Sequence, residues 1–339
     1  MTIKDLAKYL SVSVSTVSRA LCDDKNINKE TKDKVLKAAK ELGYKRNPIA
    51  LGLKTGHSNT IGVIVPEMIT PFVSLVLNGI QDVLNEHNIR ILVTDSNHDP
   101  EKERENIHML ERCFVDGIII CLCNYNKNRE EFLRLQKAGM PIIFYDRIPH
   151  GLEVSQVIIN DYLKSFFLVE RLIRAGRRNI VHVQGPDNIY NSIERLRGYR
   201  DALAKYNIPF DKETMLFQCS TQLEDSSKIA DLFVENIKHN KNINAVFAFS
   251  EMQGLGIMNR LMEHGIKIPE EIAIASLTGT ILSNYVYPKM TAVEAPMYQM
   301  GATAAELLLA KIKDPQTPNK TVVLDAEIKM RQSTPPIIQ

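Results

Sequence analysis

The chain has 339 residues, of which 44% are hydrophobic, and its 42 basic and 40 acidic side chains give a formal net charge of +2. A chain of this length exceeds what one hydrophobic core usually organises, so we expect more than one domain. The N-terminus lacks the apolar centre of a signal peptide, no stretch approaches the length of a membrane span, and five cysteines without disulfide-framework spacing indicate reduced thiols, so we expect a cytoplasmic protein.

The first predicted elements are two short amphipathic helices within residues 2–22. Thr2 and Asp5 have the spacing of a capping box, and Ser13 is positioned to cap the second helix. Ser11 and Val12 leave room only for a tight turn, which makes the helices cross steeply. The apolar faces consist of Ile3, Leu6, Ala7 and Leu10 in the first helix and Val17, Ala20 and Leu21 in the second.

The outward face of the second helix has the chemistry of a DNA reader. It carries Ser15, Thr16, Ser18 and Arg19. Small hydroxyls near a helix N-terminus approach phosphates and base edges closely, and an arginine fork matches guanine O6 and N7. The alternative is that these hydroxyls only cap and solvate a surface helix, but the coincidence of cap, turn and polar face favours a helix-turn-helix.

A third helix is expected from its cap at Asn28 to its stop at Gly43. Its buried stripe is predicted to contain Val35, Leu36, Ala39 and Leu42. Residues 1–59 hold twelve basic and six acidic side chains, whereas the remainder holds thirty and thirty-four, so a basic head precedes a slightly acidic body. Such basic residues often form an ordinary solvated helix face, but their concentration beside a helix-turn-helix favours phosphate contact.

Residues 46–58 combine small and aliphatic side chains at helical spacing between Pro48 and Gly56. The segment is too short for a stable isolated helix, so we expect a hinge that becomes helical against DNA or a partner chain. Leu51 or Leu53 has the character of an aliphatic wedge for the minor groove. The alternative is a flexible linker whose leucines pack on the body.

From Thr60 onward the sequence alternates aliphatic runs with stretches long enough for helices. Near-continuous apolar runs indicate parallel strands covered on both faces. The predicted strands are residues 61–65, 89–93, 117–120, 141–145 and 157–159, then 179–183, 214–217, 245–249 and 272–275. The later helices are expected at residues 162–175, 193–206 and 223–237. The simplest architecture is an all-α head followed by two doubly wound α/β lobes.

Ligands in doubly wound folds bind beyond the carboxyl ends of the strands. The residues that follow the predicted strands are Phe72, Asp95, Asp146, Asn160, Asn191, Ser250 and Thr278. No G-x-G-x-x-G follows the first strand and no P-loop occurs, which argues against nucleotide-cofactor enzymes. Cys121 and Cys123 lie on the same face of a strand without nearby partner ligands, and the histidines are scattered, so we expect neither a metal nor a cofactor.

The chain resembles the lactose-repressor (LacI) family of bacterial transcription regulators over essentially its whole length. The resemblance is carried by residues 2–7 (TIKDLA), 12–13 with 15–19 (VS and STVSR), 41–44 (ELGY), 59–66 (NTIGVIVP), 115–118 (VDGI), Arg195 with 198–199 (GY), and 246–248 (VFA). It implies a helix-turn-helix domain at residues 1–46, a hinge helix and linker at 47–58, and a periplasmic-binding-protein-like body at 59–339. Within the body it implies an N-lobe of about 59–160 and 290–322 and a C-lobe of about 161–289 and 323–339.

The resemblance also implies a homodimer whose heads read a pseudo-palindromic operator, with Leu53 as the minor-groove wedge and Val14 and Ser15 as the main base-reading positions. The DNA-binding residues expected on this basis are Thr2, Ser13, Val14, Ser15, Thr16, Ser18, Arg19, Asn28, Leu53 and Lys54. We expect no counterpart of the family's tetramer-forming leucine tail, because two prolines within residues 331–339 oppose a terminal helix. A dimer is therefore the better prediction.

The resemblance further implies a small effector in the interlobe cleft, a sugar or sugar derivative from carbohydrate metabolism. The expected contacts are Phe72, Asp146, Asn191, Arg195, Ser250 and Thr278. Arg195 has a fork suited to vicinal hydroxyls or a carboxylate, and its alternative is a surface ion pair with Glu194 or Asp201.

Two departures from the usual sugar-binding pattern leave other effectors open. Ser250-Glu251 replaces Asn-Asp, and Leu277-Thr278-Gly279 lacks the common aspartate, so a phosphorylated or acidic ligand or a partner protein also fits. An enzyme acting on a sugar needs a convincing acid-base pair, and an exported solute-binding protein has no use for a basic head. The sequence therefore predicts a regulator, expected to be a repressor, and not an enzyme.

Overall fold

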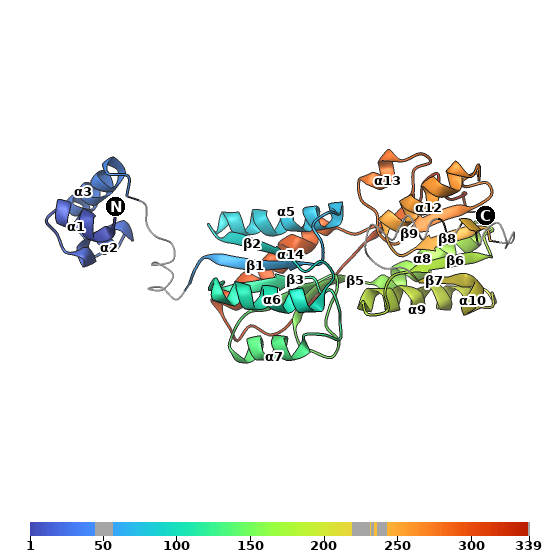
Figure 1. Ribbon diagram of the computed structural model, residues 1–339, viewed down its shortest axis with the longest axis horizontal. Helices are drawn as coiled ribbons and strands as arrows, with labels where there is room; N and C mark the ends of the chain where they lie inside the picture. The colour runs from blue at the N-terminus through green and yellow to red at the C-terminus, as the bar shows by residue number, and fades with distance from the viewer. Residues whose placement is uncertain (45–56, 219–230, 232–233, 236–242, 338–339) are drawn as a thin grey trace. The chain divides into compact units, whose positions relative to one another are not determined.

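The structure is a computed structural model that describes the chain except for residues 45–56, 219–230, 232–233, 236–242 and 338–339. It divides into two compact units, Met1–Ser58 and Asn59–Gln339 (Figure 1). The predicted hinge, with Leu51, Leu53 and Lys54, and most of the helix predicted at 223–237 lie outside the described residues. No helix of the described ranges is long and apolar enough to cross a membrane.

The described residues of the first unit form three helices, α1 (Ile3–Tyr9), α2 (Val14–Leu21) and α3 (Lys29–Glu41). Thr2 and Asp5 form the predicted capping box, while Ser13 and Asn28 accept from the backbone N–H of Thr16 and Thr31, as helix caps do. The helices enclose one small core of Leu6, Ala7, Val17, Ala20, Val35, Ala38 and Ala39. The prediction that Leu36 is buried is wrong: its side chain is 46% exposed, because Ala38 faces the core in its place.

The first sheet of the second unit has six parallel strands in the order β11-β5-β4-β3-β1-β2. Its strands are β1 (Thr60–Val65), β2 (Arg90–Asp95), β3 (Gly117–Ile120), β4 (Ile142–Tyr145), β5 (Ser155–Ile159) and β11 (Thr321–Leu324). Alternate residues of β3 pack in different cores: Ile119 lies with α5 (Pro71–Glu86) and α14 (Met297–Lys313). Ile118 and Ile120 lie with α6 (Pro100–Arg112) and α7 (Arg129–Lys137). Helices therefore cover both faces of the sheet, which explains its continuous apolar runs.

Helices α5 and α14 approach closely because two glycines face the crossing. A Cβ on Gly301 would lie 2.0 Å from the carbonyl oxygen of Val76, and a Cβ on Gly79 would lie 2.0 Å from that of Tyr298. No side chain fits either position, so backbone packs directly on backbone.

The second sheet has the order β12-β10-β9-β8-β6-β7 and is parallel except for the β10–β12 pair. Its strands are β6 (Ile180–Gln184), β7 (Leu216–Gln218), β8 (Ala245–Ala248), β9 (Ala273–Ser276), β10 (Thr291–Glu294) and β12 (Glu327–Lys329). Among the residues that the structure describes, the helices of this lobe are α8 (Asp161–Arg174), α9 (Tyr190–Lys205), α10 (Lys212–Met215), α12 (Glu251–Glu263) and α13 (Leu282–Tyr285). The strand predicted at 214–217 is displaced, because residues 212–215 form α10. Both lobes are doubly wound, as the sequence predicted.

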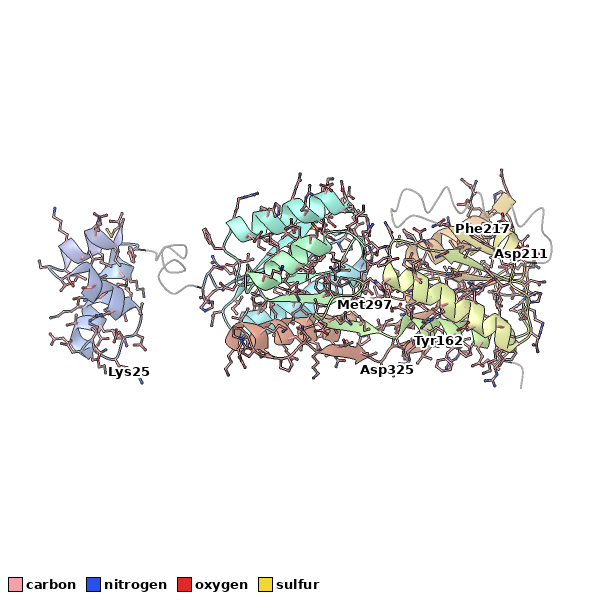
Figure 2. All side chains as sticks on the ribbon, turned by 90° about the horizontal axis from the view of Figure 1, so that it is seen from below. Lys25, Tyr162, Asp211, Phe217, Met297 and Asp325 are labelled. Carbon is pink, nitrogen blue, oxygen red and sulfur yellow. The ribbon has the colours of Figure 1, made fainter. Side chains whose placement is uncertain are left out.

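The chain passes between the two sheets three times, after β5, after β10 and after β11. Figure 2 labels Tyr162, Met297 and Asp325, which lie close to these three passages. The lobe boundaries predicted near residues 290 and 322 differ from the sheet pairing. Strand β10 pairs with β9, so residues 291–294 belong to the second lobe, and all of β11 pairs with β5, so residues 323–324 belong to the first.

Candidate functional site

The polar face of α2 is the candidate DNA-reading surface. Ser13, Val14, Ser15 and Arg19 are exposed, and Thr16 and Ser18 are half-buried. The hydroxyl of Ser13 lies 2.7 Å from that of Ser15 and 2.8 Å from that of Thr16, so the three hydroxyls form one cluster at the start of the helix. Because the first backbone N–H groups of a helix lack partners within it, this end is suited to a phosphate.

The remaining predicted DNA contacts within the head have different surroundings. Arg19 is 59% exposed and its Nε lies 3.9 Å from Asp24, a separation that leaves the guanidinium able to turn toward a base. Thr2 and Asn28 are exposed at the N-termini of α1 and α3, where their side-chain oxygens accept the capping bonds. The structure therefore presents helix N-termini and Arg19 on the head, while Leu53 and Lys54 lie outside the described residues.

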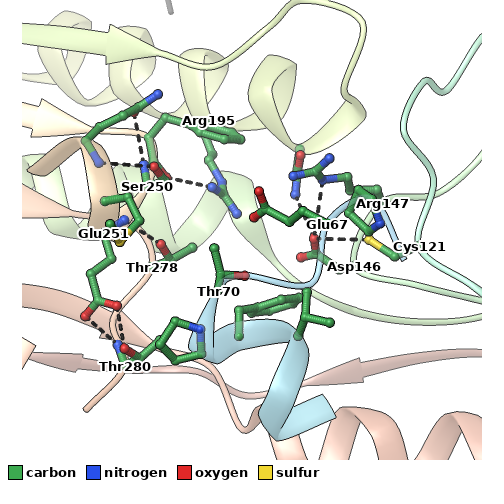
Figure 3. Close-up of a pocket in the computed structure, with 18 residues that line it drawn as sticks. Glu67, Thr70, Cys121, Asp146, Arg147, Arg195, Ser250, Glu251, Thr278 and Thr280 are labelled. Carbon is green, nitrogen blue, oxygen red and sulfur yellow. Dashed lines mark hydrogen bonds and ion pairs between the residues drawn. The ribbon is translucent and has the colours of Figure 1, made fainter. Parts of the chain in front are cut away.

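A pocket in the second unit brings together all six predicted effector contacts (Figure 3). They come from both lobes: Phe72 is the second residue of α5, Asp146 follows β4, Asn191 and Arg195 lie on α9, Ser250 caps α12, and Thr278 follows β9. Each position is close to the carboxyl end of a strand, where parallel sheets bind ligands. Asp95 and Asn160, which also follow strands, do not line the pocket. They accept backbone N–H groups of Asn97 and Leu163 and serve as local turn and cap.

One wall of the pocket carries a network of charged groups that the sequence did not reveal. Nη1 of Arg147 lies 3.4 Å from Nδ1 of His98, and Nε2 of His98 lies 3.3 Å from Glu67. Because arginine only donates, Nδ1 must accept, so we assign the imidazole hydrogen to Nε2, which donates to Glu67. Burial alone raises the pKa of Glu67, but the bond from His98 and the charge of Arg147 together hold this pKa below its ordinary value.

Asp146 stands at the centre of the same wall, with φ at +55°. Its Oδ2 accepts from Nδ2 of Asn191 at 3.5 Å and lies 3.9 Å from Nε of Arg147. Asp146 belongs to the first lobe and Asn191 to the second, so this contact spans the cleft. A left-handed backbone is uncommon for a residue other than glycine and is tolerated best by Asn and Asp.

Arg195 is buried rather than a surface residue. Its Nε–H donates to Oδ1 of Asp161 at 2.8 Å, its Nη1–H donates to the carbonyl of Phe249 at 2.7 Å, and its guanidinium lies 4.3 Å from the centre of the Phe249 ring. The alternative of a surface ion pair with Glu194 or Asp201 is wrong. Glu194 pairs with Arg197, and Asp201 accepts from the hydroxyl of Tyr162. Burial raises the pKa of Asp161 to about 6 despite the neighbouring arginine.

The opposite wall is held by Glu251, which lines the pocket but turns its carboxylate away from Asp146 (Figure 3). The backbone N–H groups of Thr280 and Ser283 donate to its Oε1 at 2.7 and 3.0 Å, and both hydroxyls also donate to the carboxylate. The N–H of Glu251 in turn donates to the hydroxyl of Thr278 at 2.8 Å. Glu251 therefore ties the start of α12 to residues 278–283.

Cys121 and Cys123 are both buried free thiols. Cys121 lines the pocket with its sulfur 3.9 Å from Oδ2 of Asp146, and Cys123 lies beside Glu103. Burial first, and then the adjacent carboxylates, raise the pKa of both thiols. No group of three ligating side chains that could hold a metal occurs within the described ranges.

The pocket residues that were not among the predicted contacts include Glu67, Thr70, Cys121, Arg147, Phe249, Glu251 and Thr280. Arg147, Phe249 and Glu251 are chain neighbours of predicted contacts, so the sequence carried a signal for them. Glu67 and Thr70 carried none, because their positions depend on the loop that leads from β1 into α5.

Comparisons with known proteins agree with this architecture. Residues 2–47 match the family model "Bacterial regulatory proteins, lacI family", and residues 169–334 match "Periplasmic binding protein-like domain". The chain is 30% identical to the HTH-type transcriptional regulator RegA of Clostridium saccharobutylicum, over 98% of this chain and 99% of that protein. It is 28% identical to the HTH-type transcriptional repressor PurR of Vibrio parahaemolyticus, with 98% of each chain covered.

Among solved structures, the transcriptional regulator CelR in complex with cellobiose superposes with a TM-score of 0.74 and 25% sequence identity, covering 98% of this chain and 99% of that one. The relatives are named as transcription regulators rather than enzymes, and their similarity extends through both the head and the body. The chain therefore belongs to the lacI family of bacterial regulatory proteins and is a DNA-binding transcription regulator, not an enzyme.

Proposed function

We propose that this regulator is a cytoplasmic repressor that binds a pseudo-palindromic operator as a homodimer and is controlled by a small molecule in the interlobe cleft. The observation that carries the proposal is the convergence of six side chains from both lobes on one pocket, in a chain that also has a helix-turn-helix head. A ligand that touches both lobes binds one lobe arrangement more tightly than another. Operator affinity can change only by this difference in the ligand's binding free energy.

For DNA reading, we propose that Val14, Ser15 and Arg19 contact base edges and that the neighbouring hydroxyls and caps contact phosphates. Val14 is 41% exposed at the first position of α2, although an apolar side chain is normally buried. This exposure favours a contact with a thymine methyl group. The hinge at residues 47–58, with Leu53 as its wedge and Lys54 beside it, is proposed to enter the minor groove.

For the effector, we propose a sugar or sugar derivative. CelR, whose structure contains cellobiose, supports this ligand class. The pocket itself combines the rings of Phe72 and Phe249 with hydrogen-bonding groups on Asp146 and Asn191. Such a mixture of apolar and polar lining suits the two kinds of surface on a sugar ring.

For the homodimer, we propose that the body docks onto a second copy through exposed apolar side chains. Leu75, Ile281 and Tyr298 line one surface groove, and Tyr285 on α13 is 78% exposed. Exposed aromatic side chains of this kind are characteristic of protein interfaces. Sedimentation should give a dimer for the natural chain and a monomer for the Ile281→Asp, Tyr298→Asp variant, and a monomeric natural chain would contradict the proposal.

The repressor proposal is tested by DNA binding combined with ligand screening. A gel shift with genomic fragments should retard a discrete site, and a thermal-shift screen against sugars, sugar phosphates and organic acids should reveal a ligand that raises Tm. That ligand should change operator affinity, whereas a ligand that stabilises the protein without changing this affinity would contradict control through the cleft.

A further inference from the structure

The two arginines of the cleft each form an ion pair with a carboxylate of the chain itself. The side chain of Arg195 is 2% exposed and donates to Asp161, whose side chain is 8% exposed. The buried guanidinium is therefore paired with a buried carboxylate. Arg147 lies between Asp146 and the Glu67–His98 pair. The positive charge of each guanidinium is therefore already balanced by a carboxylate of the chain and is not left to attract an anionic ligand.

The formal charge around the pocket is negative. Its lining includes the guanidinium groups of Arg147 and Arg195, together with the carboxylates of Glu67, Asp146 and Glu251. Asp161 stands directly behind Arg195 and adds a fourth carboxylate against two cations. Because few water molecules screen charges at such buried sites, a phosphate or carboxylate of a ligand would meet repulsion there.

The hydrogen-bonding groups of the pocket point to the same ligand class. Oδ1 of Asn191 is buried and has no hydrogen-bond partner among the described residues, and Asn191 itself is only 2% exposed. The opposite amide orientation would set this oxygen against the carboxylate of Asp146, so the observed orientation is the favourable one. Asn191 Oδ1 therefore needs a donor from the ligand, and Asp146 beside it is a further acceptor. A hydroxyl supplies such a donor, whereas a carboxylate or the dianion of a phosphate ester does not.

The nearby donor is complementary to the same hydroxyl. Nε of Arg147 is buried without a hydrogen-bond partner among the described residues, and it lies 3.9 Å from Asp146 Oδ2. A hydroxyl donates its hydrogen to a carboxylate or amide oxygen and accepts from an N–H with its lone pair. An uncharged hydroxyl group therefore satisfies both kinds of partner at once.

We infer that the cleft accepts an uncharged, hydroxyl-bearing effector and rejects its phosphorylated or carboxylated form, and that Asp161 sets this selectivity by neutralising Arg195. The inference rests on the proposed use of the cleft as the effector site. Asp161 does not line the pocket, so it is a positioning residue: it acts through the guanidinium that it holds. Removing its charge should leave Arg195 as a net cation facing the ligand.

The test measures anion binding directly and does not depend on knowing the effector. Inorganic phosphate is titrated by calorimetry against the full-length protein at constant ionic strength. The Asp161→Asn variant keeps a side-chain oxygen for the Nε–H of Arg195 but removes the charge. We expect the natural protein to bind phosphate weakly and the Asp161→Asn variant to bind it at least about tenfold more tightly, since one nearby negative charge is lost.

Two further variants locate the effect. Asp201→Asn removes one charge from the exposed face of α9, where Asp201 contacts Tyr162, and should bind phosphate like the natural protein. Adding Arg195→Gln to Asp161→Asn should abolish the gain. Equal phosphate affinity in the natural protein and Asp161→Asn, or a gain that survives Arg195→Gln, would overturn the inference. Circular dichroism on each variant separates these results from unfolding.

A second measurement compares matched neutral and phosphorylated ligands, using glucose with glucose 6-phosphate and ribose with ribose 5-phosphate. Any pair that binds the natural protein should favour the neutral member, and Asp161→Asn should move the ratio toward the phosphate ester. If the natural protein prefers a phosphate ester, the inferred selectivity for neutral ligands is wrong, although the cleft is still the effector site. A further outcome is that Asp161→Asn binds phosphate more tightly but no small molecule alters operator affinity. This result supports the inferred charge selectivity and counts against the proposed function.

Discussion

Arg195 and Asp161 are joined by a buried ion pair of 2.8 Å, although 34 residues separate them in the chain. Asp161 is the first residue of α8, directly after the chain passes from the first sheet to the second, and Arg195 lies on α9. The pair therefore fixes the start of the second lobe to the helix that lines the cleft. Breaking it should affect both stability and ligand response.

Arg195→Ala should lower the free energy of unfolding by about 3–5 kcal/mol, because it leaves the buried Asp161 without its partner. Urea denaturation followed by circular dichroism measures this loss. The double variant Asp161→Asn, Arg195→Ala should recover part of it, since the uncompensated charge is then absent. Additive losses in the double variant would show that the two side chains do not interact.

The stability of the protein should depend on pH through Asp161, whose pKa is raised to about 6 from its ordinary value of 3.8. Between these two values the folded chain binds a proton that the unfolded chain does not, so this carboxyl favours folding at low pH. Its contribution should fall by on the order of 3 kcal/mol as pH rises from about 4 to above 6. Tm measured against pH should show this difference between the natural protein and Asp161→Asn.

The control for the pH dependence is Asp201→Asn, which should follow the natural protein across the range. If Asp161→Asn also follows it, Asp161 titrates at its ordinary value and the raised pKa is contradicted. Carbon-13 NMR of the Asp161 carboxyl gives an independent midpoint, which we expect near 6.

Glu251→Gln should destabilise the second lobe by about 1–3 kcal/mol, because the amide replaces one of the two acceptor oxygens by an NH2 group, which faces the donors of Thr280 and Ser283. Glu263 on the same helix is the matched control. It pairs with Arg260 at the surface, so Glu263→Gln should cost less than about 0.5 kcal/mol. Equal urea midpoints for the two variants would show that the carboxylate of Glu251 does not hold residues 280–283.

Arg19→Ala should weaken operator binding by about 1–3 kcal/mol if the guanidinium reads a guanine. Gel shifts at one fixed salt concentration should compare operator with random DNA, because phosphate contacts depend on salt. A loss of affinity for the operator alone indicates that Arg19 reads a base. An equal loss on random DNA would show that Arg19 touches only the phosphate backbone.

The elements of the head were predictable because their signals are local. Thr2, Ser13 and Asn28 each accept a bond from a backbone N–H three residues later, so the residue types and their spacing define the helix starts. Leu36 was misassigned for the opposite reason: which of two neighbouring apolar positions is buried depends on the helices that pack against α3.

The sequence also located much of the pocket. Asp146, Ser250 and Thr278 were predicted because each follows an apolar run, and the carboxyl ends of parallel strands share one edge of a sheet. The same rule selected Asp95 and Asn160, which do not line the pocket, because it does not identify the strand ends that face the second lobe.

The sequence by itself determined the class of the protein, since caps, turns and hydrophobic periodicity depend on residues a few positions apart and specify a helix-turn-helix head with an α/β body. Only the tertiary structure decided which partners the charged side chains of the cleft bind. Asp161 lies 34 residues from Arg195, and Thr280 and Ser283 lie 29 and 32 residues from Glu251. The partners of His98 lie 31 and 49 residues away. Their pairing depends on strand order and on where the chain passes between sheets, and no local pattern encodes either.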